Sequence, residues 1–332
     1  MIYKREFHEI DGVKVYIEDI QNYNAESYSL LFYHNKYNEH SLHKYINEEE
    51  RKDYFAFLIE SYLHNYNNIR EILLNFKAYI DVDNLLNVNI SSNDIINATL
   101  KDYLYIQRDW CYYGEGEKQI NVTINAIKKL LPSDMENALF LGCGAGRLAV
   151  EFSHIFDRVL ATDKSYSMIW HINKLMSDKT FEFYTPHEKN VYSLKNVGRK
   201  HTAHISREMK KTIENKLDFF VSDVLDLPLN EKSIDAIFSI YFSDVIALKL
   251  WFDGINKILN EGGYFIHFGP LDYFFSAESA MLTADEFKLF FERNGYTAIA
   301  DEVIETSHLN DIDSFAYKVY RNWLFIAKKN TL

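Results

Sequence analysis

The stretch "LFLGCGAGRLAVEF", residues 139–152, places Gly142, Gly144 and Gly146 at alternate positions directly behind an apolar run. The apolar run predicts a buried strand, and the glycines predict a tight turn into the helix that begins at "RLAVEF". Side chains at these positions would hold a ligand away from the main chain. Because ligands of open α/β sheets bind beyond the carboxyl ends of the strands, this loop predicts a ligand site.

The spacing of these glycines separates two classes of nucleotide site. The dinucleotide fingerprint is G-x-G-x-x-G, and Arg147 stands at the position of its third glycine. The form G-x-G-x-G is instead usual in enzymes that use S-adenosylmethionine (SAM). A glycine triplet by itself is also compatible with a simple strand-to-helix turn, so further residues must decide between the two.

Two aspartates at the ends of later strands favour a nucleoside ligand. Asp163 ends the run "RVLATD", where a carboxylate can accept hydrogen bonds from both ribose hydroxyls. Asp223, in "VSDV", ends a third run and suits the adenine amino group, with Val224 against the ring. The alternative is that both aspartates only cap helices. Three such features in this order favour a nucleoside site.

The spacing of apolar residues along the chain changes near residue 118. From 119 to 330, short apolar runs alternate with helical patterns, which predicts an α/β fold with a parallel sheet, closed by "YTAIADEVI" and "NWLFIAKK" as a hairpin-like pair. We expect residues 1–118 to form a mostly helical cap with a short hairpin at "GVKVYIEDI", and the polar stretch 180–216 to be an insertion. The apolar positions at helical spacing in the cap are Tyr54, Phe55, Leu58, Ile59, Tyr62, Ile69, Ile72, Leu73, Phe76, Ile95, Ile96, Leu100, Tyr103, Leu104 and Ile106.

Composition narrows the classes of partner. The formal net charge of −12 opposes binding to nucleic acid, whose affinity comes mainly from Lys and Arg. The sequence contains no apolar run of about 18 residues and no signal-peptide core, so we expect a cytoplasmic protein with no membrane contact. Two cysteines are too few for a disulfide framework or a cysteine-rich zinc site, and we expect no metal. The expected partner is a small molecule or short peptide-like substrate, and a homodimer is left open.

Several separate motifs resemble the carnosine N-methyltransferase family, a branch of the class I SAM-dependent methyltransferases with a helical N-terminal region. "NNIREILLNF" and "YLYIQRDW" resemble its cap, "LGCGAGRLAVE" its glycine loop and "TDKSYSM" its acidic ribose motif. "DAIFSIYFSD" resembles its fourth strand, and "GGYFIHFGPLDY" its fifth strand with the Gly-Pro-Leu-x-Tyr continuation. The similarity covers roughly residues 61–330. It implies a Rossmann-like sheet, mostly parallel with an antiparallel last strand, and SAM as cofactor.

The resemblance also implies roles for individual residues. Arg108 would bind the methionine carboxylate of SAM, since a planar guanidinium suits a carboxylate, and Tyr105 stands where the family has a glutamine. Asp163 would hold the ribose, and Ile240 would line the base pocket beside Asp223 and Val224. The full set of expected SAM-binding residues is Tyr105, Arg108, Trp110, Gly142, Cys143, Gly144, Gly146, Arg147, Asp163, Lys164, Ser165, Asp223, Val224 and Ile240.

The acceptor end departs from the family pattern. The family holds its acceptor imidazole with an aspartate after the fourth strand, matched by Asp244, and a histidine whose position here is Phe274. His267 is a possible substitute, although a strand histidine more often forms hydrogen bonds within a core. Tyr320 aligns with a family tyrosine near the substrate. The predicted catalytic residues are Asp244, Tyr273 and Tyr320, and the predicted substrate-binding residues are Tyr241, Asp244, His267 and Phe274.

The leading functional prediction is a SAM-dependent N-methyltransferase that acts on a small amine, imidazole or peptide-like acceptor. Such a transfer depends mainly on holding the acceptor and the sulfonium methyl group in line. Because the family histidine is replaced, the amine of SAM itself is an alternative nucleophile, as in cyclases that form azetidine-2-carboxylate and methylthioadenosine. A third alternative is a non-catalytic SAM-binding scaffold.

Overall fold

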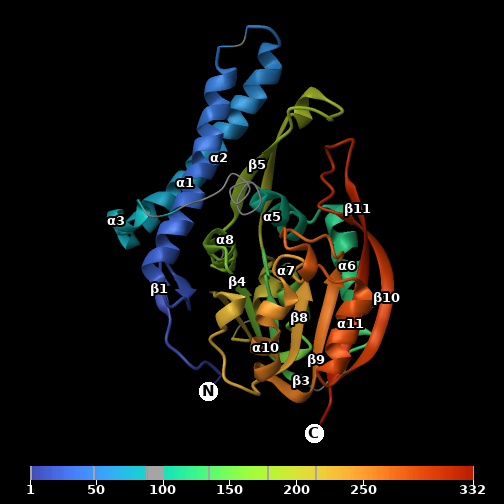
Figure 1. Ribbon diagram of the computed structural model, residues 1–332. Coiled ribbons are helices and arrows are strands. Elements are labelled where there is room, and N and C mark those ends of the chain that lie inside the picture. The colour runs from blue at the N-terminus through green and yellow to red at the C-terminus, as the bar shows by residue number, and fades with distance from the viewer. Residues whose placement is uncertain are drawn as a thin grey trace.

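The computed structural model describes residues 2–331 except 48, 87, 89–100, 134, 178 and 214. The predicted helical positions Ile95, Ile96 and Leu100 therefore lie outside the described residues. Nine strands of the described chain form one sheet in the order β1-β2-β7-β4-β3-β8-β9-β11-β10 (Figure 1). Their bounds are β1 (His8–Ile10), β2 (Val13–Val15), β3 (Met135–Leu141), β4 (Phe156–Asp163), β7 (Leu217–Val221), β8 (Ile234–Ile240), β9 (Leu259–Gly269), β10 (Tyr296–His308) and β11 (Lys318–Lys329).

The middle of the sheet confirms the predicted fold class. Strands β7, β4, β3, β8 and β9 pair in parallel, β11 pairs antiparallel with β9, and β10 pairs antiparallel with β11. Parallel strands are covered on both faces, which explains their nearly continuous apolar runs. Phe140 of β3 and Phe238 of β8 stack with ring centroids 4.2 Å apart on one of these faces.

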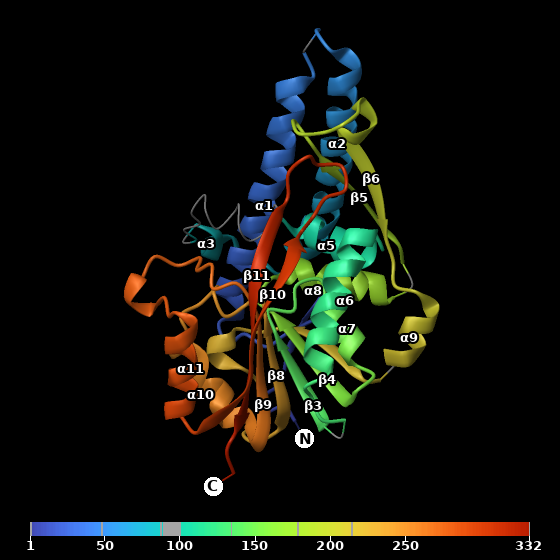
Figure 2. The ribbon, with the colours of Figure 1, turned by 90° about the vertical axis from the view of Figure 1, so that its right-hand side faces the viewer.

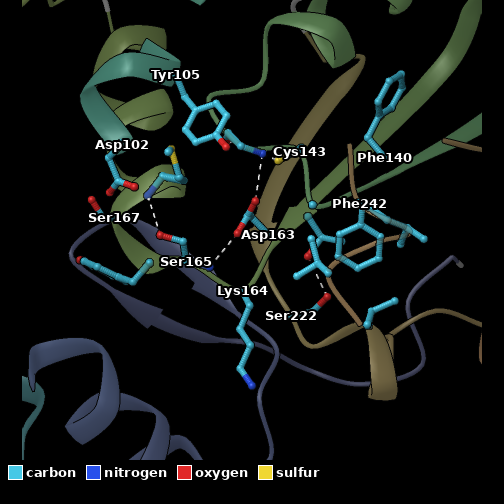
Figure 3. A pocket seen from close by; sticks show the side chains of 18 of the residues that line it. Asp102, Tyr105, Phe140, Cys143, Asp163, Lys164, Ser165, Ser167, Ser222 and Phe242 are labelled. Atoms are coloured by element: carbon cyan, nitrogen blue, oxygen red, sulfur yellow. Dashed lines mark hydrogen bonds between the residues drawn. The ribbon is translucent and has the colours of Figure 1, made fainter. Parts of the chain in front are cut away.

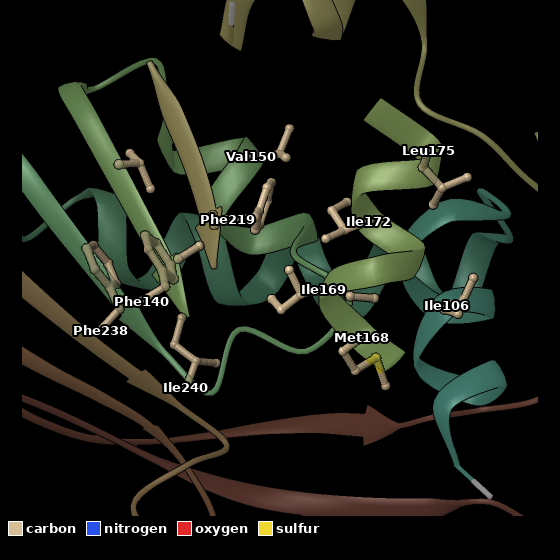
Figure 4. Close-up of a cluster of buried hydrophobic side chains, with 14 of the residues drawn as sticks. Ile106, Phe140, Val150, Met168, Ile169, Ile172, Leu175, Phe219, Phe238 and Ile240 are labelled. Carbon is tan, nitrogen blue, oxygen red and sulfur yellow. The ribbon is translucent and has the colours of Figure 1, made fainter. Parts of the chain in front are cut away.

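Helices cover the sheet on both sides (Figure 2). One side holds α10 (Leu248–Ile258) and α11 (Ala284–Arg293), and the other holds α6 (Gly114–Lys128), α7 (Arg147–Phe152) and α8 (Tyr166–Met176). Figure 4 shows the hydrophobic core on the side of the sheet that α7 and α8 cover. There Val150 of α7 and Ile169 of α8 lie over strand side chains such as Phe219. The α11 helix begins after a capping box formed by Thr283 and Glu286. These two layers fix the strand ends at which the candidate site lies.

The N-terminal hairpin belongs to the central sheet. Asp11 and Gly12 both have positive φ and form the turn between β1 and β2. The hairpin predicted at "GVKVYIEDI" is therefore wrong in position, because its first strand precedes that stretch. An Asp-Gly pair favours this kind of turn because glycine tolerates the left-handed region. Val15 of β2 then pairs with Val221 of β7, which extends the sheet beyond its parallel part. The domain boundary near residue 118 stays a prediction, since α6 spans it.

Most of the remaining described N-terminal residues are helical. A long pair, α1 (Ile20–Tyr45) and α2 (Lys52–Phe76), rises beyond the sheet, followed by η1 (Lys77–Tyr79), α3 (Val82–Leu85) and α5 (Asp102–Trp110) (Figure 1). The apolar positions of α2 are buried at Tyr54, Leu58 and Ile69, in line with the helical spacing in the sequence. Among the described residues, every helix is too short or too polar to cross a bilayer.

Residues 180–216 contain a separate two-stranded sheet of β5 (Phe181–Pro186) and β6 (Gly198–Ala203), with η2 (Leu194–Asn196) between them and α9 (Arg207–Ile213) after them. The Asn65 side chain of α2 forms two hydrogen bonds with the backbone of Tyr184, at 2.9 and 3.0 Å. His187 contacts Asp311, in the β10–β11 connection, at 2.9 Å. This small sheet therefore joins the helical pair to the end of the β10–β11 hairpin. Two short turns, η3 (Val224–Asp226) and η4 (Glu278–Ala280), complete the described elements.

Candidate functional site

A cavity of about 430 Å³ lies at the carboxyl ends of β3, β4, β7 and β8, beneath α1 and α5 (Figure 3). This is the position at which open α/β sheets bind ligands. Of the residues predicted to form the site, those that line the cavity are Tyr105, Arg108, Gly142, Cys143, Gly144, Asp163, Lys164, Ser165, Asp223, Val224, Ile240 and Tyr241. The structure thus brings together predicted residues from five separate segments of the chain.

The glycines of the loop serve two different purposes, close packing and open space next to the cavity. Gly142, Gly144 and Gly146 all have positive φ, a region that costs side-chain-bearing residues energy. A Cβ atom at Gly142 would lie 2.4 Å from the Phe242 ring, and one at Gly146 would lie 2.7 Å from the Phe219 ring. At Gly144 a Cβ atom would meet no described protein atom within 4 Å. Gly144 therefore leaves open space on the cavity side, while the other two allow close packing.

Asp163 is held rigidly at the end of β4. One carboxylate oxygen accepts the Gly144 N–H at 2.9 Å, and the other accepts the Ser165 N–H at 2.8 Å. Burial raises the pKa of Asp163, and these backbone N–H groups oppose the rise. Ser165, whose hydroxyl accepts the Met168 N–H, is the N-cap of α8. Asp163 is therefore not the helix cap, and each of its oxygens keeps a second lone pair for a ligand.

Asp223, unlike Asp163, caps a short helix and pairs with a lysine. One of its carboxylate oxygens accepts the Leu225 N–H at 3.0 Å, as the N-cap of η3. The other accepts a hydrogen bond from Lys164 at 2.9 Å. The capping alternative therefore describes Asp223, although its side chain also lines the cavity next to Val224.

Arg108 enters the cavity from α5. Its Nε atom donates to the Asp109 carboxylate at 2.6 Å, and within the described chain this is the partner recorded for its side chain. The two terminal nitrogens of the fork are thus available to a carboxylate. The guanidinium lies 5.5 Å from the centroid of the Tyr105 ring, one turn earlier on the same helix.

Trp110, Arg147 and the last glycine of the loop, Gly146, do not line the cavity. The Trp110 indole is fully buried and donates to the Ala145 carbonyl at 2.7 Å. The Arg147 guanidinium, nearly fully buried, contacts Glu117 and Glu151 at 2.9 and 2.7 Å and donates to the Asp109 carbonyl. These contacts fix the loop to α5 and α6, so the predicted cofactor role of Trp110 and Arg147 becomes a supporting one.

Two of the predicted acceptor-end residues, Tyr273 and Phe274, lie on a loop next to Asp244, which follows β8. Asp244 is 3% exposed, and its carboxylate accepts the Asp272 N–H at 3.3 Å. Burial raises the pKa of Asp244 to about 6. The Tyr273 hydroxyl donates to the Leu282 carbonyl at 2.7 Å, and the Phe274 side chain is 57% exposed. The loop that follows β9 therefore wraps around Asp244, beside the wall of the cavity.

His267 lies away from this group. It has no exposed surface, its ring packs 5.3 Å from Trp323 and 5.7 Å from Phe287, and its Nδ1 atom pairs with the Ser243 hydroxyl at 3.0 Å. Burial lowers its pKa to about 4. The His267 side chain points to the face of the sheet that α11 covers. His267 therefore packs in the core like an ordinary strand histidine and does not line the cavity.

Two features of the site have no motif in the sequence. Tyr23, Glu26 and Ser27 of α1 line the cavity, and the Tyr23 hydroxyl donates to the Lys164 carbonyl at 2.8 Å. His308, at the end of β10, lies with its ring centroid 5.2 Å from Tyr241 and 4.7 Å from Tyr320. Neither the start of α1 nor the segment around His308 carries a spacing that indicates a ligand, so only the fold reveals them.

Comparison with known proteins finds similar sequences and similar structures. The chain is 22% identical to carnosine N-methyltransferases of Dictyostelium discoideum and Schizosaccharomyces pombe, over 77% and 76% of its length. These matches span 59% of the Dictyostelium protein and 75% of the Schizosaccharomyces protein. A solved SAM-dependent methyltransferase from Methanosarcina mazei gives a TM-score of 0.41 at 12% identity, over 62% of this chain and 98% of that chain. The model of the carnosine N-methyltransferase family matches residues 83–331, and the chain belongs to that family.

Proposed function

We propose that the chain is a SAM-dependent N-methyltransferase that acts on a small amine, imidazole or peptide-like acceptor. The observation that carries this proposal is the cavity at the strand ends, where the open side of Gly144 faces a carboxylate fixed by two backbone N–H groups. Bare main chain next to an oriented Asp163 suits a nucleoside whose ribose hydroxyls need a paired acceptor. Membership of the carnosine N-methyltransferase family supports the same cofactor.

The cofactor would supply an electrophilic methyl group, and the chain would supply positioning. In this proposal Arg108 binds the amino-acid carboxylate, and Ile240 and Val224 contact the adenine. Tyr241 and Phe242, which follow β8 and line the cavity, place aromatic rings where the sulfonium charge would lie. Trp110 and Arg147 keep the glycine loop in place from behind.

The acceptor would approach from the side of Tyr241 that faces β10 and β11. There Tyr241, His308 and Tyr320 form a ring cluster, and the Tyr320 hydroxyl is 3.4 Å from the Asp272 carboxylate. Burial lowers the pKa of His308 to about 3, and its buried Nδ1 atom has no partner among the described residues. A neutral imidazole with an unused nitrogen can hydrogen-bond a polar acceptor group. Asp244 would orient the acceptor nitrogen or take its proton.

Product analysis tests the proposal against both alternatives. The protein is incubated with SAM, with and without histidine-containing dipeptides and a metabolite extract, and the nucleoside product is identified by mass. We expect S-adenosylhomocysteine that appears only when an acceptor is present. Methylthioadenosine formed without any acceptor would establish the cyclase alternative, and tight binding without turnover would establish the scaffold.

A further inference from the structure

The cavity carries more negative than positive side chains. Its lining includes the acidic residues Glu26, Asp102, Asp109, Asp163 and Asp223 and the basic residues Arg108 and Lys164. Two of these acids are paired with the two bases, Asp109 with Arg108 at 2.6 Å and Asp223 with Lys164 at 2.9 Å. Asp163 accepts two backbone N–H groups. Glu26 accepts a hydrogen bond from the Asn22 side chain at 3.0 Å, which leaves Asp102 as the acid for which none of these contacts gives an account.

Asp102 is placed unusually for a carboxylate. It is the first residue of α5, is 3% exposed, and lines the cavity next to Ser167 (Figure 3). Its second oxygen, Oδ2, is buried without a hydrogen-bond partner among the described residues. A buried carboxylate oxygen without a partner is costly, so a ligand that supplies a donor or a positive charge is expected there.

The same helix provides a carboxylate partner nearby. Asp102, Tyr105 and Arg108 are spaced three residues apart, so they lie along one side of α5 and all line the cavity. The α-carbons of Asp102 and Arg108 are about 9 Å apart along the axis, and helical side chains lean toward the N-terminus, which brings the long arginine back toward Asp102. The pKa of Tyr105 is raised first by burial and then shifted by the charges of Arg108, Asp102 and Asp163. These three groups therefore lie near enough to Tyr105 to shift the pKa of its hydroxyl.

We infer that Asp102 binds the α-ammonium group of the SAM amino-acid end, while Arg108 binds its α-carboxylate. This inference rests on the proposed function and names a residue that recognises one end of the cofactor. An α-amino acid carries the two opposite charges on one carbon, and α5 presents a matching pair of opposite charges. The ribose, held by Asp163, would then lie between this helix and the adenine pocket.

Calorimetry with two ligands tests the inference. S-adenosylhomocysteine carries both α-groups, and methylthioadenosine carries neither. For Asp102→Asn we expect affinity for S-adenosylhomocysteine to fall about ten- to hundredfold, the usual contribution of a charge-assisted hydrogen bond. Affinity for methylthioadenosine should stay within about twofold, which also shows that the variant folds and keeps its cavity. Asp253→Asn, which removes an exposed carboxylate of α10 outside the cavity lining, is the matched control and should change neither affinity by more than about threefold.

The outcomes separate this inference from the proposed function. Equal weakening of both ligands by Asp102→Asn, or unchanged affinity for S-adenosylhomocysteine, would overturn the role of Asp102 and leave the SAM site standing. An S-adenosylhomocysteine analogue that lacks the amino group should bind wild type and Asp102→Asn equally, and a large difference there would also overturn it. If the wild-type chain binds neither nucleoside, both the proposed function and the inference fail.

Discussion

Replacing Asp244 by asparagine should stabilise the folded chain at neutral pH and remove activity with the acceptor. Asp244 is 3% exposed, and burial raises its pKa to about 6 from an ordinary value of 3.8. Between these values the folded chain binds more protons than the unfolded chain, so its stability falls as the pH rises. The difference in pKa corresponds to a cost of about 3 kcal/mol above pH 7, as an upper estimate. Asparagine avoids this cost and keeps an oxygen for the Asp272 N–H.

Urea unfolding of wild type and Asp244→Asn at several pH values between 4 and 8 measures this effect. The variant should gain stability relative to wild type mainly between pH 4 and 6, with a constant difference above pH 7. Asp272→Asn, which removes an exposed carboxylate on the neighbouring loop, controls for the loss of one negative charge. A stability difference that does not depend on pH, or a variant that is less stable at pH 8, would refute the reasoning. Turnover that survives intact in Asp244→Asn would remove the residue from the mechanism.

Three further predictions concern the loop and the acceptor end. Gly142→Ala should lower the free energy of unfolding by about 2–4 kcal/mol, because the residue has a positive φ and its Cβ atom would lie 2.4 Å from the Phe242 ring. Gly295→Ala is the control: Gly295 also has a positive φ, but a Cβ atom there meets open space. In the same urea titration it should therefore cost at least 1 kcal/mol less than Gly142→Ala. Arg147→Met should cost about 2–4 kcal/mol, since it leaves two partly buried glutamates unpaired, and a thermal melt with no shift would contradict this. His308→Ala should raise the KM for the acceptor about tenfold or more and leave SAM affinity unchanged; a loss of SAM affinity instead would place the residue at the cofactor.

The strands at the centre of the sheet can be predicted from local sequence patterns. Continuous apolar runs such as "NALFL" end at glycine or aspartate, and these ends became the edge of the sheet where the cavity lies. Strong local signals of this kind survive because the parallel strands are buried on both faces. The hairpin at the N-terminus was misplaced because the decisive residues, Asp11 and Gly12, lie at its turn and not at its start.

The candidate site divides in the same way. The sequence predicts that Asp163 and Gly144 lie at the cavity because backbone geometry at a strand end demands those residue types in a fixed order. It does not single out His308 or Asp102, because their surroundings depend on which elements pack together over long separations. His267 could be judged only in the structure, since the period of a strand does not say which face holds the ligand.

The central claim is that a nucleoside lies over Gly144 with its ribose on Asp163. Calorimetry of S-adenosylhomocysteine with Asp163→Ala, on protein shown by thermal unfolding to be folded, tests this most directly. We expect affinity to fall about hundredfold or more, because two charge-assisted hydrogen bonds from the ribose hydroxyls to the carboxylate would be lost. Affinity within about twofold of wild type would contradict it.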